Sequence, residues 1–338
     1  QAKGGQPYDW AEQSPTIAAH LADAGYRTVQ VMSDSYFSRR WKDGPSHGFD
    51  VRDATATRKT ADPQHTAPEV TERVIKQIER AAKEDEPTFL WAHYYDHHSP
   101  FRQPSGGVKY GESTADVYDA ELHFADRHWG RVFRALADTF EPDEYVIVFT
   151  SDHGEAFDEF HPKKHHGYDL RHPVVHVPLL VRAPHAAPRR VPGLVTHADV
   201  APTLADLAGA KRHRSWIGES LTPVLYDAAH PRKNVVYAIF YIPERVRSGR
   251  DPFSLLSVRT GDLYYEADYE ADTERLTRWR GTTATDDDII DARPDDAAML
   301  RHLAAAKLRD LRASERGLRG TKLDKTAAPG SPDAQPLK

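Results

Sequence analysis

The sequence predicts an α/β fold, with a mixed, largely parallel sheet between helices and a small C-terminal α+β subdomain. Up to about residue 225, segments with apolar residues at helical spacing alternate with short β-branched runs of strand length. Beyond that point, closely spaced strands are followed by one helix. The composition, 39% hydrophobic and 28% charged, is typical of a globular chain. We therefore predict an α/β domain over 1–225, an α+β subdomain over 226–315 and a disordered tail over 316–338.

The first helix and strand illustrate how each element is predicted. Ser14 is a suitable N-cap, Pro15 suits the first helical turn and Gly25 suits the position after the helix. The run "RTVQVM" at 27–32 then predicts a strand. By the same criteria we expect further helices from Pro68 and over 114–138, 197–210 and 294–314. Strands are expected at 87–96, 144–150 and 177–184, with hairpin strands at 234–242, 253–269 and 273–281, while 38–66 reads as irregular.

The bulk composition excludes several classes of function. The formal net charge is −6, whereas a nucleic-acid-binding domain is usually basic, so no nucleic-acid partner is expected. The chain has no cysteine, which excludes disulfides, thiolate metal sites and a cysteine nucleophile within it. No apolar run approaches the ~18 residues that span a bilayer. The first residues contain no signal-peptide hydrophobic region.

Three predicted strands end in polar clusters, which suggests where a site lies. These clusters are Ser33-Asp34, Asp96-His97-His98 and Ser151-Asp152-His153. Parallel sheets bind ligands beyond the carboxyl ends of their strands. If the three strands run parallel, the clusters share one edge of the sheet.

Asp152 and His153 allow two interpretations. A carboxylate and an imidazole can hold a divalent cation if the backbone bends after the strand, and Gly154 permits that bend. Alternatively, Ser151 or Asp152 caps a helix that starts here. The spacing alone does not choose between a metal site and a helix cap, and two ligands do not suffice to hold a metal.

Two cationic segments complete the set of candidates. In "DHHSPF", the histidine pair at a strand end could bind an anionic ester oxygen or protonate a leaving group. In "HPKKHHG", two lysines and three histidines follow shortly after Asp152 and would suit a phosphate or sulfate substrate. The alternatives are a surface loop for the first segment and a solvated run of charges for the second.

Taken together, several stretches resemble the sulfatase family of the alkaline phosphatase superfamily. They occur in the family's order between about residues 14 and 225, and "TSDHGE" followed by "HG" and "VPLLVRAP" is specific as a set. The matching stretches are "SPTIAAHLADAGYRT", "GFDV", "PTFLWAHYYDHHSPF", "VYDAELHFADRHWGRVFRAL", "VIVFTSDHGEAF", "HHGYDLRHPVVHVPLLVRAP", "VTHADVAPTLADLAG" and "GESL".

The resemblance implies roles for four residues, and the cationic segment adds Lys164. Asp152 and His153 match the family's metal ligands, so a single divalent cation, Ca²⁺, Mg²⁺ or Zn²⁺, is expected as cofactor. His98 and His166 match positions that contact the substrate, and we expect them to be catalytic. Lys164, in the same cationic segment as His166, is expected to bind the anionic ester substrate.

The chain also departs from the family pattern. His97 replaces the usual Pro, Arg171-His172-Pro173 replaces an acidic pair, and His176 replaces an Arg. The family's first metal-binding Asp and its nucleophile precede the stretch that begins at Ser14, and no "C/S-x-P-x-R" occurs in the chain. We therefore expect the nucleophile to lie upstream, the 338 residues alone to be inactive, and one edge of the sheet to be exposed.

The resulting functional prediction is a metal-dependent hydrolase of sulfate or phosphate esters, represented by its C-terminal portion. One alternative is a membrane-tethered transferase of phospho-head-groups, whose tether would lie in an upstream segment. The other is a catalytically inactive relative that retains the scaffold for binding. The family resemblance also implies an extracytoplasmic location.

Overall fold

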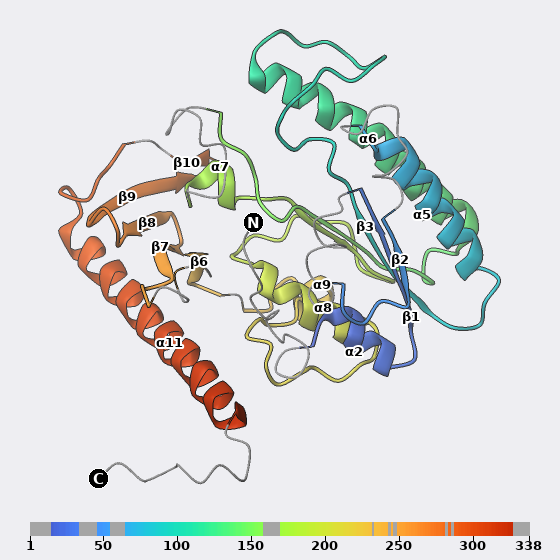
Figure 1. The fold of residues 1–338 in the computed structure, drawn as a ribbon. Helices are drawn as coiled ribbons and strands as arrows, with labels where there is room; N and C mark the ends of the chain where they lie inside the picture. Colours follow the sequence, from blue (N-terminus) through green and yellow to red (C-terminus); the bar gives the residue numbers. More distant parts are fainter. Residues whose placement is uncertain are drawn as a thin grey trace. The chain divides into compact units, whose positions relative to one another are not determined.

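The computed structural model divides the chain into two compact units (Figure 1), which are described separately. The first unit comprises residues 1–150 and 178–232, and the second comprises residues 151–177 and 233–338. The structure describes residues 15–33, 46–54, 65–157, 170–231, 233–242, 245, 249–280, 283–284 and 287–326.

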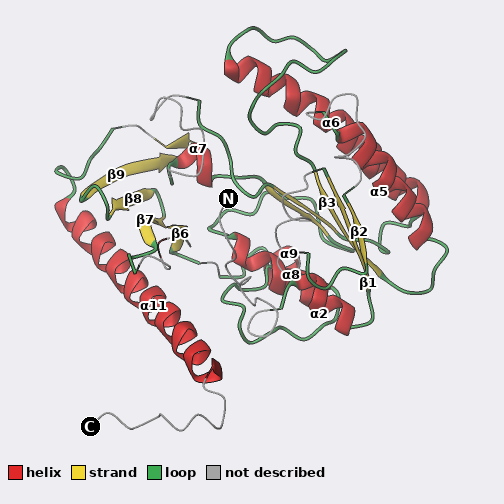
Figure 2. Ribbon diagram, viewed as in Figure 1, coloured by secondary structure: helices red, strands yellow, loops and turns green. Residues whose placement is uncertain are grey.

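A parallel sheet of three strands organises the first unit, with the order β2-β1-β3 (Figure 2). Strand β1 (Arg27–Met32) is buried along its whole length and pairs in parallel with β2 (Val51–Asp53) and β3 (Thr88–His93). This confirms the predicted α/β class with a parallel sheet. Strand β2 was not predicted, because three residues are too few to show a periodic pattern.

Helices cover the sheet on both faces, as Figure 1 shows. Helix α5 (Ala67–Ala81) places Val70, Val74 and Ile78 on one face, against the β1 valines, and α6 (Thr114–Thr139) packs beside it. Helices α2 (Ile17–Asp23) and α8 (Val200–Leu207) contact each other, and α2 also contacts β1. The unit also contains η1 (His197–Asp199) and α9 (Thr222–Tyr226).

The start of α2 differs from the prediction. The N-cap is Thr16, whose side-chain oxygen accepts a hydrogen bond from the backbone N–H of Ala19 at 3.1 Å. Pro15 therefore precedes the cap instead of occupying the first turn, and the predicted cap Ser14 lies outside the described residues. Both Ser and Thr are favoured N-caps, so the sequence "SPT" offered two choices.

The remaining two strands of this unit run antiparallel. Strand β4 (Ile147–Thr150) pairs with β5 (Leu179–Arg182) in a separate two-stranded sheet. The expectation that three parallel strand ends share one edge is therefore supported only for β1 and β3, where the N–H of Ser33 donates to the carbonyl of His93 at 3.1 Å. Asp34 lies outside the described residues.

The second unit has an antiparallel sheet in the order β10-β9-β8-β7-β6. This confirms the predicted hairpin strands of the C-terminal part. Long helix α11 packs on one face, and Leu256, Tyr265, Leu276 and Leu300 lie in the core between them. Among the described residues, no helix is both long and apolar enough to cross a membrane. The elements are α7 (His172–Val175), β6 (Val236–Tyr241), β7 (Phe253–Thr260), β8 (Leu263–Asp268), β9 (Thr273–Arg280), β10 (Thr283–Ala284) and α11 (Pro294–Thr326).

Helix α11 continues to Thr326, into the segment for which the sequence predicts a disordered tail. Its opening matches the prediction, with Pro294 at the first position and Asp295 and Asp296 in the first turn, where carboxylates favour the positive end of the helix dipole. Residues 327–338 lie outside the described part of the chain.

Candidate functional site

The segment that follows β4 carries the two predicted metal ligands. Residues 151–157 form no helix, so the interpretation of Asp152 as a helix cap is excluded. The hydroxyl of Ser151 donates to the carbonyl of His153 at 2.6 Å, and the N–H of His153 donates to Asp152 Oδ1 at 3.0 Å. These local bonds fix a tight polar bend at the end of the strand.

The hydrogen bonds of His153 determine which ring nitrogen can accept a metal. Nδ1 lies 2.8 Å from the carbonyl oxygen of Gly154, and because a carbonyl only accepts, Nδ1 carries the proton. In the neutral ring the lone pair is then on Nε2, which lies 3.6 Å from Asp152 Oδ2. The side chains are 37% and 69% exposed for His153 and Asp152, respectively. An accessible carboxylate and imidazole nitrogen therefore lie side by side.

Gly154 allows this bend to pack closely against α7. Its N–H donates to the carbonyl of Val174 at 2.7 Å, and a Cβ atom at this position would lie 2.0 Å from the carbonyl oxygen of Pro173. Any side chain would clash with the helix backbone. The glycine was predicted to permit a bend; the structure shows that it also permits the contact with α7.

The donor set fits a divalent cation in part. Asp152 and His153 offer oxygen and nitrogen ligands of the kinds that Zn²⁺ accepts, and the carboxylate alone also suits Ca²⁺ or Mg²⁺. In the ranges that the structure describes, no group of three or more metal-ligating side chains occurs. Further ligands must come from other residues.

The segment after β3 begins with a buried carboxylate. Asp96 has no exposed surface, and its Oδ1 accepts a hydrogen bond from the backbone N–H of Ala67 at 2.8 Å, at the start of α5. The hydroxyl of Thr66 donates to Oδ2 at 3.3 Å. Desolvation raises the pKa of Asp96 to about 6, although these bonds and the nearby His65 oppose the rise. Asp96 therefore serves the fold by holding the first turn of α5.

His98 is oriented by its own loop. Its ring stacks on Tyr95 with a centroid distance of 4.2 Å and an interplanar angle of 18°. Nδ1 lies 2.6 Å from the carbonyl oxygen of Ser99, so Nδ1 carries a proton. His97 instead meets Trp129 and Tyr118 edge-on, with centroids 6.0 and 6.3 Å away. The two neighbouring histidines therefore have different surroundings.

The structure places the predicted residues as follows. His98 lies in the first unit, and Asp152 and His153 lie together in the second unit. Lys164 and His166 lie outside the described residues. The structure therefore brings together the predicted metal pair, while the roles of His98, Lys164 and His166 remain predictions.

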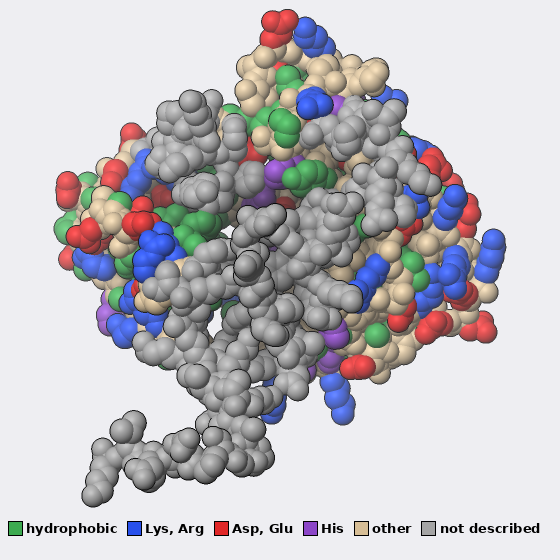
Figure 3. Space-filling model, in the orientation of Figure 1, with side chains coloured by type: hydrophobic (Ala, Val, Ile, Leu, Met, Phe, Trp, Pro, Cys, Tyr) green, Lys and Arg blue, Asp and Glu red, His purple; other side chains and the backbone are tan. Residues whose placement is uncertain are grey.

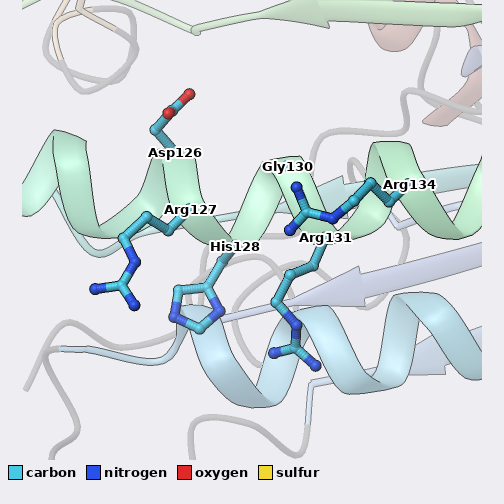
Figure 4. Close-up of a pocket in the computed structure, with 6 residues that line it drawn as sticks. All are labelled: Asp126, Arg127, His128, Gly130, Arg131 and Arg134. Carbon is cyan, nitrogen blue, oxygen red and sulfur yellow. The ribbon is translucent and has the colours of Figure 1, made fainter.

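Two surface pockets contain none of these predicted residues. One, of about 390 Å³, lies along α6, and Figure 4 shows the side chains of Arg127, His128 and Arg131 projecting from the same side of that helix. Arg131 is paired with Glu72, and desolvation lowers the pKa of His128. All the residues that line this pocket lie on α6, so the pocket is less suited to a reaction than a site at a strand end. The other, of about 440 Å³, lies beside Arg182, which is held by backbone carbonyls.

A cluster in the second unit was missed as a site. His172 and His176 on α7 meet Trp279 of β9 at centroid distances of 4.4 and 5.0 Å, and the guanidinium carbon of Arg259 lies 3.8 Å from the centre of the same ring. The sequence signal was the spacing of the two histidines, four residues apart. Trp279 and Arg259 are too distant in sequence to be joined to them without a structure.

Comparison with known proteins agrees with the fold. The family model "Sulfatase" matches residues 7–210. An uncharacterized sulfatase, YidJ, of Escherichia coli (strain K12) is 26% identical over 195 residues, which cover 46% of this chain and 38% of the relative. The chain thus matches about two fifths of the length of that relative.

Two solved structures share the fold at low sequence identity. A phosphonate monoester hydrolase from Silicibacter pomeroyi has a TM-score of 0.66 at 18% identity, covering 91% of this chain and 81% of that one. A 2-O GAG sulfatase has a TM-score of 0.65 at 16% identity, covering 91% and 76%. With the family match over residues 7–210, these similarities identify the chain as a member of the sulfatase family, within the alkaline phosphatase superfamily.

Proposed function

We propose that the protein hydrolyses sulfate esters with the help of one divalent cation, and that Asp152 and His153 supply two of its ligands. The observation that carries the proposal is the geometry of this pair: an exposed carboxylate beside an imidazole whose Nδ1 is committed to the Gly154 carbonyl. A metal-binding histidine commonly donates its other N–H to such a carbonyl. The family membership supplies the reaction class.

The proposed cation would neutralise the ester oxygens and activate a nucleophile. We assign no nucleophile among the 338 residues. His98 would supply a proton donor, because its Nδ1 is fixed by the Ser99 carbonyl and its ring is held on Tyr95. A ring held in this way loses little orientational freedom when it binds a charged oxygen or protonates a leaving oxygen. Lys164 and His166 would add positive charge for an anionic substrate.

The test uses the full-length protein, wild type and Asp152→Ala, with 4-nitrophenyl sulfate, a phosphate monoester and a phosphodiester as substrates. We expect sulfate ester hydrolysis and one tightly bound divalent cation per wild-type chain. Asp152→Ala should lose the cation and most of the activity, because removing one ligand of a small set exposes the ion to exchange.

Each outcome has a defined consequence. Elemental analysis that finds an unchanged metal content in folded Asp152→Ala would contradict the assignment of the ligand. If the protein prefers a phosphate ester, its substrates are phosphate esters and not sulfate esters. If the metal-loaded protein hydrolyses none of the three substrates, the alternative that it is catalytically inactive is favoured. Glu155→Ala is the matched control, since Glu155 lies in the same segment and has no assigned role.

A further inference from the structure

Arg259 is a partly buried cation without a counter-ion. Its Nε is buried and makes no hydrogen bond. Among the residues that the structure describes, no carboxylate or carbonyl pairs with its guanidinium. Desolvation lowers the pKa of Arg259, which shows that its surroundings disfavour the charge. Withdrawing this Nε–H donor from water without an acceptor is costly.

An aromatic ring holds this cation in place. The guanidinium carbon lies 3.8 Å from the centre of the Trp279 ring, and Trp279 is 3% exposed. Stacking on an aromatic face fixes a guanidinium but leaves its N–H edges unbonded. Such a group is prepared for an acceptor with two oxygens, since Arg binds carboxylates and sulfate-like oxyanions through paired N–H groups.

Two histidines and a tyrosine lie beside this ring. His172 Nε2 and His176 Nδ1 lie 3.2 Å apart, so one nitrogen donates a proton to the other, and both rings contact Trp279. Tyr264 lies next to Arg259 in the strand pairing, with its hydroxyl donating to the Leu170 carbonyl. Imidazole N–H groups beside an unpaired guanidinium would favour an anion.

Helix α7 connects this cluster to the candidate metal pair within the second unit. Helix α7, which begins at His172 and is capped by His176, also accepts the hydrogen bond from Gly154, which follows directly after Asp152 and His153. Figure 1 shows α7 beside β8 and β9. One short helix therefore contacts both the segment with the metal ligands and the ring that holds Arg259.

We propose that Arg259, held against Trp279, binds an oxyanion group of the substrate other than the sulfate ester that is hydrolysed. This inference rests on the proposed function for the identity of the substrate. The binding of an oxyanion by Arg259 stands on the local contacts alone. The consequence is a preference for substrates that carry more than one anionic group.

The first experiment measures binding of inorganic sulfate by calorimetry at constant ionic strength, with the full-length protein. We expect Arg259→Gln to weaken sulfate binding by about 10- to 100-fold, the usual worth of a hydrogen bond to a charged group. The matched control is Arg278→Gln, an arginine of the same sheet whose Nη1 is paired with Asp262 at 2.8 Å; it should bind sulfate as the wild type does. Equal binding by wild type and Arg259→Gln, or no binding by wild type, would overturn the proposal.

Thermal unfolding distinguishes binding from packing. If Arg259 only packs on Trp279, Arg259→Gln should lower the unfolding temperature equally with and without sulfate. If Arg259 binds sulfate, the difference in unfolding temperature between Arg259→Gln and the wild type should increase as sulfate is added. Should Arg259→Gln fail to fold, Arg259→Lys keeps the charge but not the paired donors, and we expect it to bind sulfate more weakly than wild type; undiminished binding by this variant would also overturn the proposal.

The second experiment compares kcat/KM on 4-nitrophenyl sulfate and on a disaccharide with two sulfate groups. Arg259→Gln should lower the ratio of disaccharide to aryl sulfate by about 10-fold or more, whereas Arg278→Gln should keep the wild-type ratio. An unchanged ratio in Arg259→Gln would contradict a role with the substrate. If no sulfate ester is hydrolysed by any variant, the proposed function fails, and the calorimetric result still decides whether Arg259 binds an oxyanion.

Discussion

Two strands of this protein, β3 and β4, are each followed by an Asp-His pair, and the two pairs have different surroundings. After β3, Asp96-His97 begins a segment whose carboxylate is fully buried and bound to the first turn of α5. After β4, Asp152-His153 forms a bend whose carboxylate is 69% exposed. The strand–Asp–His pattern therefore does not determine the role of the acid. What differs is the partner: an N–H at a buried helix start for Asp96, and the adjacent histidine for Asp152.

The residue that follows each Asp-His pair also determines what its segment presents. Gly154 lets the second segment lie directly on the α7 backbone, so its acid and imidazole project from a supported bend. In the first segment His98 occupies the third position and stacks on Tyr95. One segment thus presents a possible ligand pair, and the other presents a single oriented imidazole.

Of the substitutions that test this comparison, Gly154→Ala should have the largest effect on stability and metal binding together. The new Cβ would lie 2.0 Å from the Pro173 carbonyl oxygen, so the segment must move away from α7. We expect a loss of roughly 1–3 kcal/mol in the free energy of unfolding, the usual cost of overpacking, together with loss of metal binding. Denaturant unfolding and elemental analysis measure the two effects.

The control for this substitution is Gly130→Ala. Gly130 lies inside α6, where a Cβ would meet only the end of the Arg134 side chain at 3.5 Å. Alanine there should stabilise the protein by about 0.5–1 kcal/mol, because it favours the helix. Wild-type stability and metal content in Gly154→Ala would show that the contact with α7 does not support the site.

The next largest effect concerns His98. His98→Ala should lower the rate on sulfate esters by roughly 10²–10⁴-fold, the range for a positioned proton donor, without loss of metal. The measurement is kcat with the full-length, metal-loaded protein, alongside His230→Ala as an exposed histidine outside the site. A wild-type rate in His98→Ala would leave the first segment with a structural role only.

Much of this architecture could be predicted because it is encoded locally. The apolar face of α5, the buried run of β1 and the change to hairpins after residue 225 are periodic patterns in sequence. The direction of β5 relative to β4 is not a local property, since either orientation buries a short apolar run. For the same reason the sequence predicted one shared edge for three strand ends, of which the structure supports two.

The candidate site was predictable only in part. Asp152 and His153 follow an apolar strand and match a family motif, so the sequence proposes them as ligands, and that assignment stays a prediction. The burial of Asp96 depends on where α5 begins relative to β3, and the contact of Arg259 with Trp279 depends on strand pairing. Both are consequences of tertiary structure, which the one-dimensional pattern does not contain.

The last prediction is the sharpest test of the comparison, because it applies one substitution to both acids. The folded-state pKa of Asp96 is raised to about 6, above the ~3.9 of an unfolded chain. A raised pKa stabilises the fold below pH ~4, and this contribution is lost as the pH rises through about 6. Over that window the free energy of unfolding of the wild type should therefore fall by about 3 kcal/mol on account of this group.

Asp96→Asn should remove that dependence. The amide oxygen can still accept from the Ala67 N–H, and no charge is buried, so the variant should be more stable than wild type at pH 7 and differ less at pH 4. Asp152→Asn is the matched substitution; because Asp152 is 69% exposed, the change in stability without metal should stay within about 0.5 kcal/mol at both pH values. Urea unfolding at pH 4, 5, 6 and 7 measures all three proteins. If Asp96→Asn follows the wild-type curve, or if Asp152→Asn departs from it by more than this, the assignment of Asp96 to the fold and Asp152 to the site is wrong.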